Sequence, residues 1–123
     1  MFFRHFFILT SIFYFAFAQS DFEQGVSWYS NRHDGSSGIN ASNESIDKAI
    51  GYFSSALQSK EYENDAAVYL LKSYFYKAEY AIQDKDEKKD VFNKGKALGE
   101  KYIEKYPHSA EFRYWYLVNL GSW

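Results

Sequence analysis

Apolar and aromatic side chains recur every three or four residues along most of the chain from residue 21 onward. In the segment 64–82 the spacings are 3, 3, 1, 3 and 4, through Val68, Leu71, Tyr74, Phe75, Ala78 and Ile82. This spacing gathers side chains on one side of an α-helix, whereas a half-buried strand alternates every two residues. The pattern predicts five helices, at about 21–32, 45–59, 64–82, 88–106 and 110–121.

Polar residues mark where these helices begin and end. Capping side chains predict the starts of three of them: Ser45 for the second helix, Asn64 or Asp65 for the third, and Ser109 for the fifth. Pro107 ends the fourth. The Gly-, Ser- and Asn-rich segment 34–43 is predicted to be a loop, and the charged run 84–90 a solvated helix junction. The elements predict an all-α fold.

The first 18 residues have the pattern of a secretory signal peptide. Arg4 is the only charged side chain before Asp21, an apolar run of about a dozen residues follows, and the run ends in Ala16-Phe17-Ala18. We expect cleavage after Ala18, the alternative being an uncleaved N-terminal anchor. The run is short for a membrane span. The mature protein, residues 19–123, is then expected to be one domain that does not insert stably into a membrane. We expect it to be periplasmic, or secreted if the source has no periplasm.

Composition narrows the class of partner. The net charge is −2 for the whole chain and −3 once Arg4 is removed. Nucleic acids and anionic lipid surfaces require a basic face, so neither is an expected partner. The chain contains no cysteine, so it has neither a disulfide nor a lipidated cysteine at the cleavage site.

The chain resembles itself after a shift of 46 residues. Residues 45–77 then lie on 91–123 without a gap, and apolar positions coincide, as with Ile46 on Phe92 and Tyr69 on Trp115. A fixed period of 20–50 residues with two helices per unit is typical of an α-solenoid, in which antiparallel helix pairs stack.

The residues of this repeat resemble the tetratricopeptide pattern. The second helix of a repeat is matched by Ala49-x3-Phe53-x2-Ala56 and, more weakly, by Gly95-x3-Gly99-x2-Tyr102 followed by Pro107. The first helix is matched by Gly25-x2-Trp28, Val68-x2-Leu71-x3-Phe75 and Tyr114-x2-Leu117. Gly95 and Gly99 each cost about 1 kcal/mol within a helix, so close helix packing is their expected reason. The segments 33–44 and 83–90 are interpreted as insertions that lengthen the period to 46.

The stretch from Phe92 to Gly121 is also similar to the T component of tripartite ATP-independent periplasmic (TRAP) transporters. Phe92-Asn-Lys-Gly95, Pro107-His-Ser-Ala-Glu and Tyr114-Trp-Tyr-Leu-Val-Asn-Leu-Gly121 carry the likeness. It implies a periplasmic helical-repeat protein that oligomerises and cooperates with a solute-binding protein. Members are commonly lipoproteins, and this chain has no cysteine to carry the lipid. Its last helix also has no following helix to cover it, which suggests a fragment or packing on another subunit.

Catalytic and metal-binding patterns are not found, so we expect neither an enzyme nor a cofactor. His33 and His108 each lack a second ligand at helical spacing, whereas zinc needs three or four. The serines cluster in loops and caps, with no base placed to activate them. The acidic run 84–90 lacks the glycine and closing glutamate of a calcium loop.

The remaining candidates are aromatic and polar residues of the first helix in each repeat. They predict a partner-binding groove lined by Tyr29, Tyr69, Ser73, Tyr76, Lys77, Trp115 and Asn119. Tyr and Trp are typical binding anchors because each joins a large apolar ring to a polar tip. The alternative is that these rings only cover the core or support self-association into a homo-oligomer.

The sequence favours two functions over an enzymatic one. The first is an exported, non-catalytic scaffold that binds a protein or peptide through this groove. The second is a TRAP-type transporter accessory, which binds a solute-binding protein and turns Lys77 or Arg113 toward a small organic acid.

Overall fold

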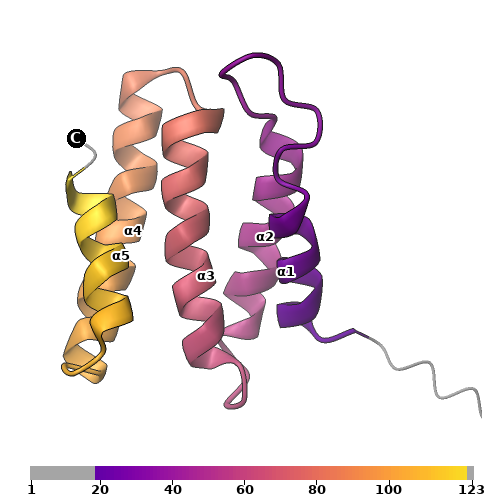
Figure 1. Ribbon diagram of the computed structural model, residues 1–123. Helices are drawn as coiled ribbons and strands as arrows, with labels where there is room; N and C mark the ends of the chain where they lie inside the picture. Colours follow the sequence, from indigo (N-terminus) through magenta and orange to yellow (C-terminus); the bar gives the residue numbers. More distant parts are fainter. Residues whose placement is uncertain (1–18, 122–123) are drawn as a thin grey trace, which may run out of the picture.

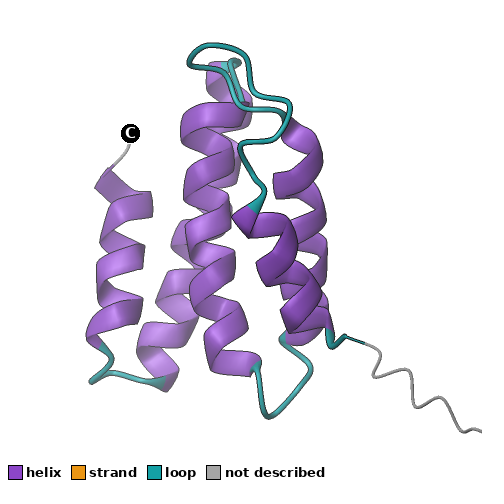
Figure 2. Cartoon of the chain, turned by 45° about the vertical axis from the view of Figure 1, so that its right-hand side comes forward, coloured by secondary structure: helices purple, strands orange, loops and turns teal. Residues whose placement is uncertain are grey.

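The computed structural model describes residues 19–121, which form five α-helices, one π-helical segment and no β-strand. The elements are α1 (Asp21–Ser30), α2 (Asn43–Ala56), α3 (Glu63–Tyr76), η1 (Lys77–Ala81), α4 (Lys85–Lys105) and α5 (Ala110–Gly121). The chain reverses direction at each connection, so the helices stand side by side (Figure 1), with the connecting loops at the two ends (Figure 2). The predicted all-helical fold is confirmed. The predicted signal peptide, 1–18, lies outside the described residues.

Helix α3 stands in the middle and contacts all four other α-helices. On one side of it, Ile46, Phe53 and Leu70 belong to a buried cluster that α1 and α2 complete. On the other side, Leu71, Tyr102 and Phe112 join α3 to α4 and α5. A third cluster, formed by η1 and α4, contacts Tyr74 and Phe75 of α3. The apolar residues of α3 are therefore divided between several cores, which is why its sequence is apolar around much of its circumference.

Three glycines lie where helices come closest. A Cβ atom on Gly25 of α1 would lie 2.6 Å from the Phe53 ring, and one on Gly99 of α4 would lie 2.8 Å from the Tyr116 ring. A Cβ atom on Gly95 would collide with the side-chain amide of Asn119. The prediction that Gly95 and Gly99 serve close packing is confirmed.

The predicted N-caps of two helices are wrong. Ser42 caps α2, since its Oγ atom accepts a hydrogen bond from the Glu44 backbone N–H at 3.3 Å. Ser45 is instead 5% exposed inside the helix, because it shares the core-facing side with Ala49 and Phe53, one and two turns later. Helix α3 begins after Tyr62 without a side-chain cap, so the predicted caps at Asn64 and Asp65 are also wrong.

The charged run 84–90 is not an insertion between helices but the start of α4. Asp84 is the N-cap, and its Oδ1 atom accepts hydrogen bonds from the backbone N–H groups of Asp86 and Glu87 at 3.0 and 2.9 Å. Acidic residues in a first helical turn are stabilised by the helix dipole, so this charge favours a helix start. The predicted start of α5 is confirmed, since Ser109 Oγ accepts from the Phe112 N–H at 3.3 Å.

The third predicted helix changes character at its C-terminal end. It is α-helical to Tyr76 and continues as a π-helix to Ala81. No helix within residues 19–121 is long and apolar enough to cross a membrane.

Candidate functional site

Tyr29 and Tyr69 lie in contact between the first three helices. Their rings meet edge to face with centroids 5.5 Å apart, and Tyr69 also stacks on Phe53 at 5.1 Å. Both rings are half-buried. Burial raises the pKa of the Tyr29 hydroxyl above its ordinary value, an effect that the nearby Arg32 charge opposes. The two predicted tyrosines therefore cover the core while keeping part of their surface accessible.

Lys72 connects this aromatic cluster to α5, and the sequence analysis missed it. Its Nζ atom lies 4.8 Å from the centroid of the Tyr69 ring and 5.4 Å from that of Trp115. No carboxylate within residues 19–121 pairs with Lys72. A signal was present, because Lys72 follows Tyr69 by three residues and so shares its side of the helix.

Ser73 and Asn119 are both fully buried. Ser73 Oγ donates to the Tyr69 carbonyl at 2.7 Å. Asn119 Nδ2 donates to the carbonyls of Leu71 and Trp115 at 3.2 and 2.9 Å, which ties α5 to α3. The Oδ1 atom of Asn119 is buried without a partner among the described residues. In this conformation neither side chain is accessible from outside, so neither lines an open groove.

Tyr76 and Lys77 make contacts other than those of Lys72 with Tyr69 and Trp115. Tyr76 is 5% exposed, and its hydroxyl donates to the Arg32 carbonyl at 3.2 Å and is hydrogen-bonded to His33 Nδ1 at 3.0 Å. The Nζ atom of Lys77 forms an ion pair with Asp47 Oδ1 of α2 at 2.6 Å. These two residues therefore hold the loop after α1 and the helix α2, respectively.

The predicted residues thus fall into three groups. Tyr29, Tyr69 and Trp115 are partly accessible and are joined, with Lys72, into a continuous surface that we call the aromatic–lysine face. Ser73 and Asn119 are internal, and Tyr76 and Lys77 serve other contacts. Helical spacing placed the predicted residues of α3 on one face but could not show which of them are buried. That face contacts different neighbouring helices at different points along its length.

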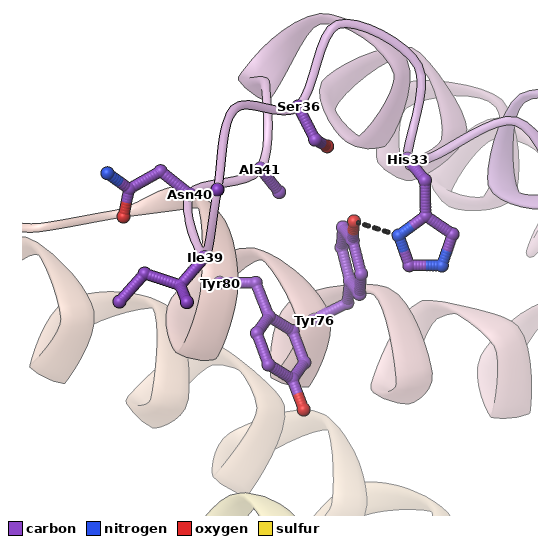
Figure 3. A pocket seen from close by; sticks show the side chains of 8 residues that line it. His33, Ser36, Ile39, Asn40, Ala41, Tyr76 and Tyr80 are labelled. Carbon is purple, nitrogen blue, oxygen red and sulfur yellow. Dashed lines mark hydrogen bonds between the residues drawn. The ribbon is translucent and has the colours of Figure 1, made fainter.

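A hollow lies at the end of the molecule, between the loop 31–42 and η1 (Figure 3). It has a volume of about 290 Å³. Its lining consists of His33, Ser36, Gly38, Ile39, Asn40, Ala41, Tyr76 and Tyr80. In the sequence, His33 is a candidate metal ligand without a second ligand at helical spacing, and no pattern singles out Ile39 or Tyr80.

Backbone hydrogen bonds and two glycines shape the loop over this hollow. The Ala41 N–H donates to the Tyr80 carbonyl at 2.8 Å, which attaches the loop to η1. Gly35 and Gly38 have φ angles of 75° and 60°, in the left-handed region that favours glycine. Burial raises the pKa of the Tyr76 hydroxyl, while the Arg32 charge and a hydrogen bond with Ser36 oppose the shift. The Ala41 hydrogen bond therefore holds the loop against η1 and keeps it beside the hollow.

Within residues 19–121 no group of three His, Asp or Glu side chains is placed to hold a metal ion. No protein-family model, curated protein or solved structure matches this chain. Its function is therefore argued from the accessible residues of the aromatic–lysine face and of the loop hollow.

Proposed function

We propose that the protein is an exported, non-catalytic helical-repeat scaffold that binds a protein or peptide through the aromatic–lysine face. The observation that carries the proposal is the position of Lys72, a cation held between the rings of Tyr69 and Trp115 and without an acidic partner among residues 19–121. Each ring contact of this kind contributes about 0.5–1 kcal/mol at an exposed site, so Lys72 is positioned before a partner binds.

The chemistry of this face favours an acidic, extended partner. Tyr69 and Trp115 supply large rings that lose little conformational freedom on binding. The Lys72 charge attracts a carboxylate, and the two rings contact the apolar atoms beside it. Preorganisation of the lysine reduces the entropy lost on association.

We place this face on a tetratricopeptide-like solenoid of antiparallel helix pairs. Two observations support the proposal. A shift of 46 residues carries the bounds of α3, 63–76, onto 109–122, within one residue of the bounds of α5. The small residues that the pattern requires lie at close helix contacts, as Gly25 does against Phe53.

Reversal of the Lys72 charge tests the binding face. The chain, with its first residue established by mass spectrometry, is immobilised and exposed to an envelope extract of its source. We expect a partner that the wild type retains and that Lys72→Glu loses, because the cation that attracts the carboxylate becomes an anion. With the purified partner, the dissociation constant rises at least about tenfold, and added salt weakens wild-type binding.

Lys60→Glu is the matched control, since Lys60 is exposed, precedes α3 and makes no described contact. It changes the net charge by the same amount and leaves binding intact. Equal capture of the same partner by wild type and Lys72→Glu, with both proteins folded by circular dichroism, contradicts the proposal.

The second candidate is the TRAP-type accessory, favoured by the likeness of the stretch that forms α4 and α5. A stoichiometric complex with a solute-binding protein in the same experiment supports it. Arg113 is the better residue for an organic acid, because it is exposed, whereas Lys77 is already paired with Asp47. Capture of other envelope proteins alone argues for the general scaffold.

A further inference from the structure

The loop hollow has apolar walls at its mouth. Ile39 is 91% exposed and Tyr80 is 45% exposed, although both side chains are large and hydrophobic. They come from opposite sides, Ile39 from the loop and Tyr80 from η1 (Figure 3). Apolar side chains that remain exposed around one hollow are typical of a binding site, and π-helical turns such as η1 occur frequently at functional sites.

The inner end of the hollow is polar. The hydroxyl groups of Ser36 and Tyr76 point toward one another there (Figure 3). The Tyr76 hydroxyl already has partners in the Arg32 carbonyl, His33 and Ser36, whereas Tyr76 is the one described partner of the Ser36 hydroxyl. Ser36 is therefore the group best able to exchange a hydrogen bond with a ligand, since a hydroxyl donates once and accepts twice.

Size and charge limit the ligand class. The volume of about 290 Å³ lies at the lower end of the range for small-molecule sites, which is roughly 300–1,000 Å³. A single substituted ring fits this space, and a nucleotide cofactor does not. The lining contains no Asp, Glu, Lys or Arg, and its one basic side chain, His33, is hydrogen-bonded to the Tyr76 hydroxyl, so no carboxylate, ammonium or guanidinium group is present to pair with a charged ligand.

We propose that this hollow binds a small, uncharged aromatic molecule of the size of phenol or indole. The ring lies between Ile39 and Tyr80, and its O–H or N–H group reaches Ser36. This site is independent of the proposed function, because it shares no residue with the aromatic–lysine face. Failure of either proposal leaves the other standing.

Titration with four named probes tests the site. Phenol and indole are the neutral probes, and benzoate and benzylamine are charged compounds of similar size. Chemical shifts of the ¹⁵N-labelled chain follow the binding. We expect phenol and indole to shift residues 33–41 and 76–81 with a dissociation constant of about 1 mM or lower, and the charged probes to bind at least about tenfold more weakly.

Two variants locate the binding. Ile39→Asp places a charge at the mouth, and Tyr80→Ala removes one wall; each should weaken phenol binding at least tenfold. Leu117→Asp is the matched control, because Leu117 is an equally apolar residue, 60% exposed, on α5. It should leave binding unchanged. Thermal melting shows that each variant is folded.

Three outcomes overturn the proposal. The first is no shift in residues 33–41 and 76–81 up to the solubility limit of both neutral probes. The second is binding that survives both Ile39→Asp and Tyr80→Ala. The third is binding of benzoate or benzylamine as tight as that of phenol, which would contradict a site that selects uncharged ligands.

Discussion

Tyr102 shows how one side chain depends on its partners. It is 1% exposed, and its hydroxyl donates to Glu63 Oε1 at 3.2 Å, the oxygen that also accepts from Lys105 Nζ at 2.7 Å. Burial, reinforced by the Glu63 carboxylate, raises the pKa of Tyr102 to about 12. The hydrogen bond from Lys105 acts in the other direction on Glu63 and lowers the pKa of that carboxyl group.

The raised pKa of Tyr102 predicts a loss of stability at high pH. An unfolded tyrosine ionises near pH 10, while Tyr102 stays neutral in the folded protein up to about pH 12. The stabilisation is therefore complete below pH 10 and is lost as pH rises from 10 through 12. Urea denaturation across this range should show the unfolding free energy falling less steeply for Tyr102→Phe than for wild type.

Tyr114→Phe is the control for this experiment, since Tyr114 is 60% exposed on α5. Its pH profile should follow that of wild type. Parallel loss of stability in wild type and Tyr102→Phe would show that Tyr102 does not cause the effect.

At the scale of elements, contacts between helices explain residues that helix propensity disfavours. The chain places two glycines, Gly95 and Gly99, within the 21 residues of α4. Both face α5 at distances that leave no room for a Cβ atom, whereas Gly51 of α2 has nothing within 4 Å of such an atom. The same residue type is therefore required in one helix and replaceable in another.

Two glycine substitutions should change stability in opposite directions. Gly95→Ala should lower the unfolding free energy by about 1–3 kcal/mol, because the new Cβ atom collides with the Asn119 amide. Gly51→Ala should raise it by up to about 1 kcal/mol, since alanine favours the helix and meets no neighbour. Denaturant midpoints measure both, and a stabilising Gly95→Ala would refute the packing explanation.

At the scale of the whole molecule, no part of residues 19–121 covers the outer side of α5. Ala110, Tyr114, Leu117 and Gly121 are all exposed and lie on one stripe opposite the buried Phe112 and Asn119. The stripe is symmetric about its midpoint, with small residues at its ends and large ones within. An antiparallel α5 of a second copy would place Tyr114 against Leu117 and Ala110 against Gly121. A single symmetric interface of this kind closes as a dimer.

The stripe predicts weak, concentration-dependent dimerisation. One helix of 12 residues is about 18 Å long, which offers less than the roughly 800 Å² per partner of a standard stable interface. Sedimentation velocity should show dimers only at high concentration. Leu117→Glu should abolish them because it buries a charge, while Ile39→Glu, at an exposed apolar residue outside the stripe, should not. Dimers that persist in Leu117→Glu would contradict this interface.

Local chemistry made much of this fold predictable. Helical spacing of apolar residues located all five helices to within about three residues at each end, except where α3 gives way to η1. The Ser109 cap and the end of α4 before Pro107 depend only on neighbouring backbone groups. The glycines of α4 indicated close packing before the neighbouring helix was known. Where several polar residues precede one helix, as Ser42 and Ser45 do at α2, the sequence pattern predicted the wrong cap.

The candidate site depended on tertiary structure. Spacing along α3 grouped Tyr69, Ser73 and Tyr76, but burial separates them, because α3 is packed by α1 and α2 on one side and by α4 and α5 on the other. The sequence of one helix contains its own period but not the positions of its neighbours. The packing of the helices places Lys72 between Tyr69 of α3 and Trp115 of α5. It also places the loop after α1 over Tyr80.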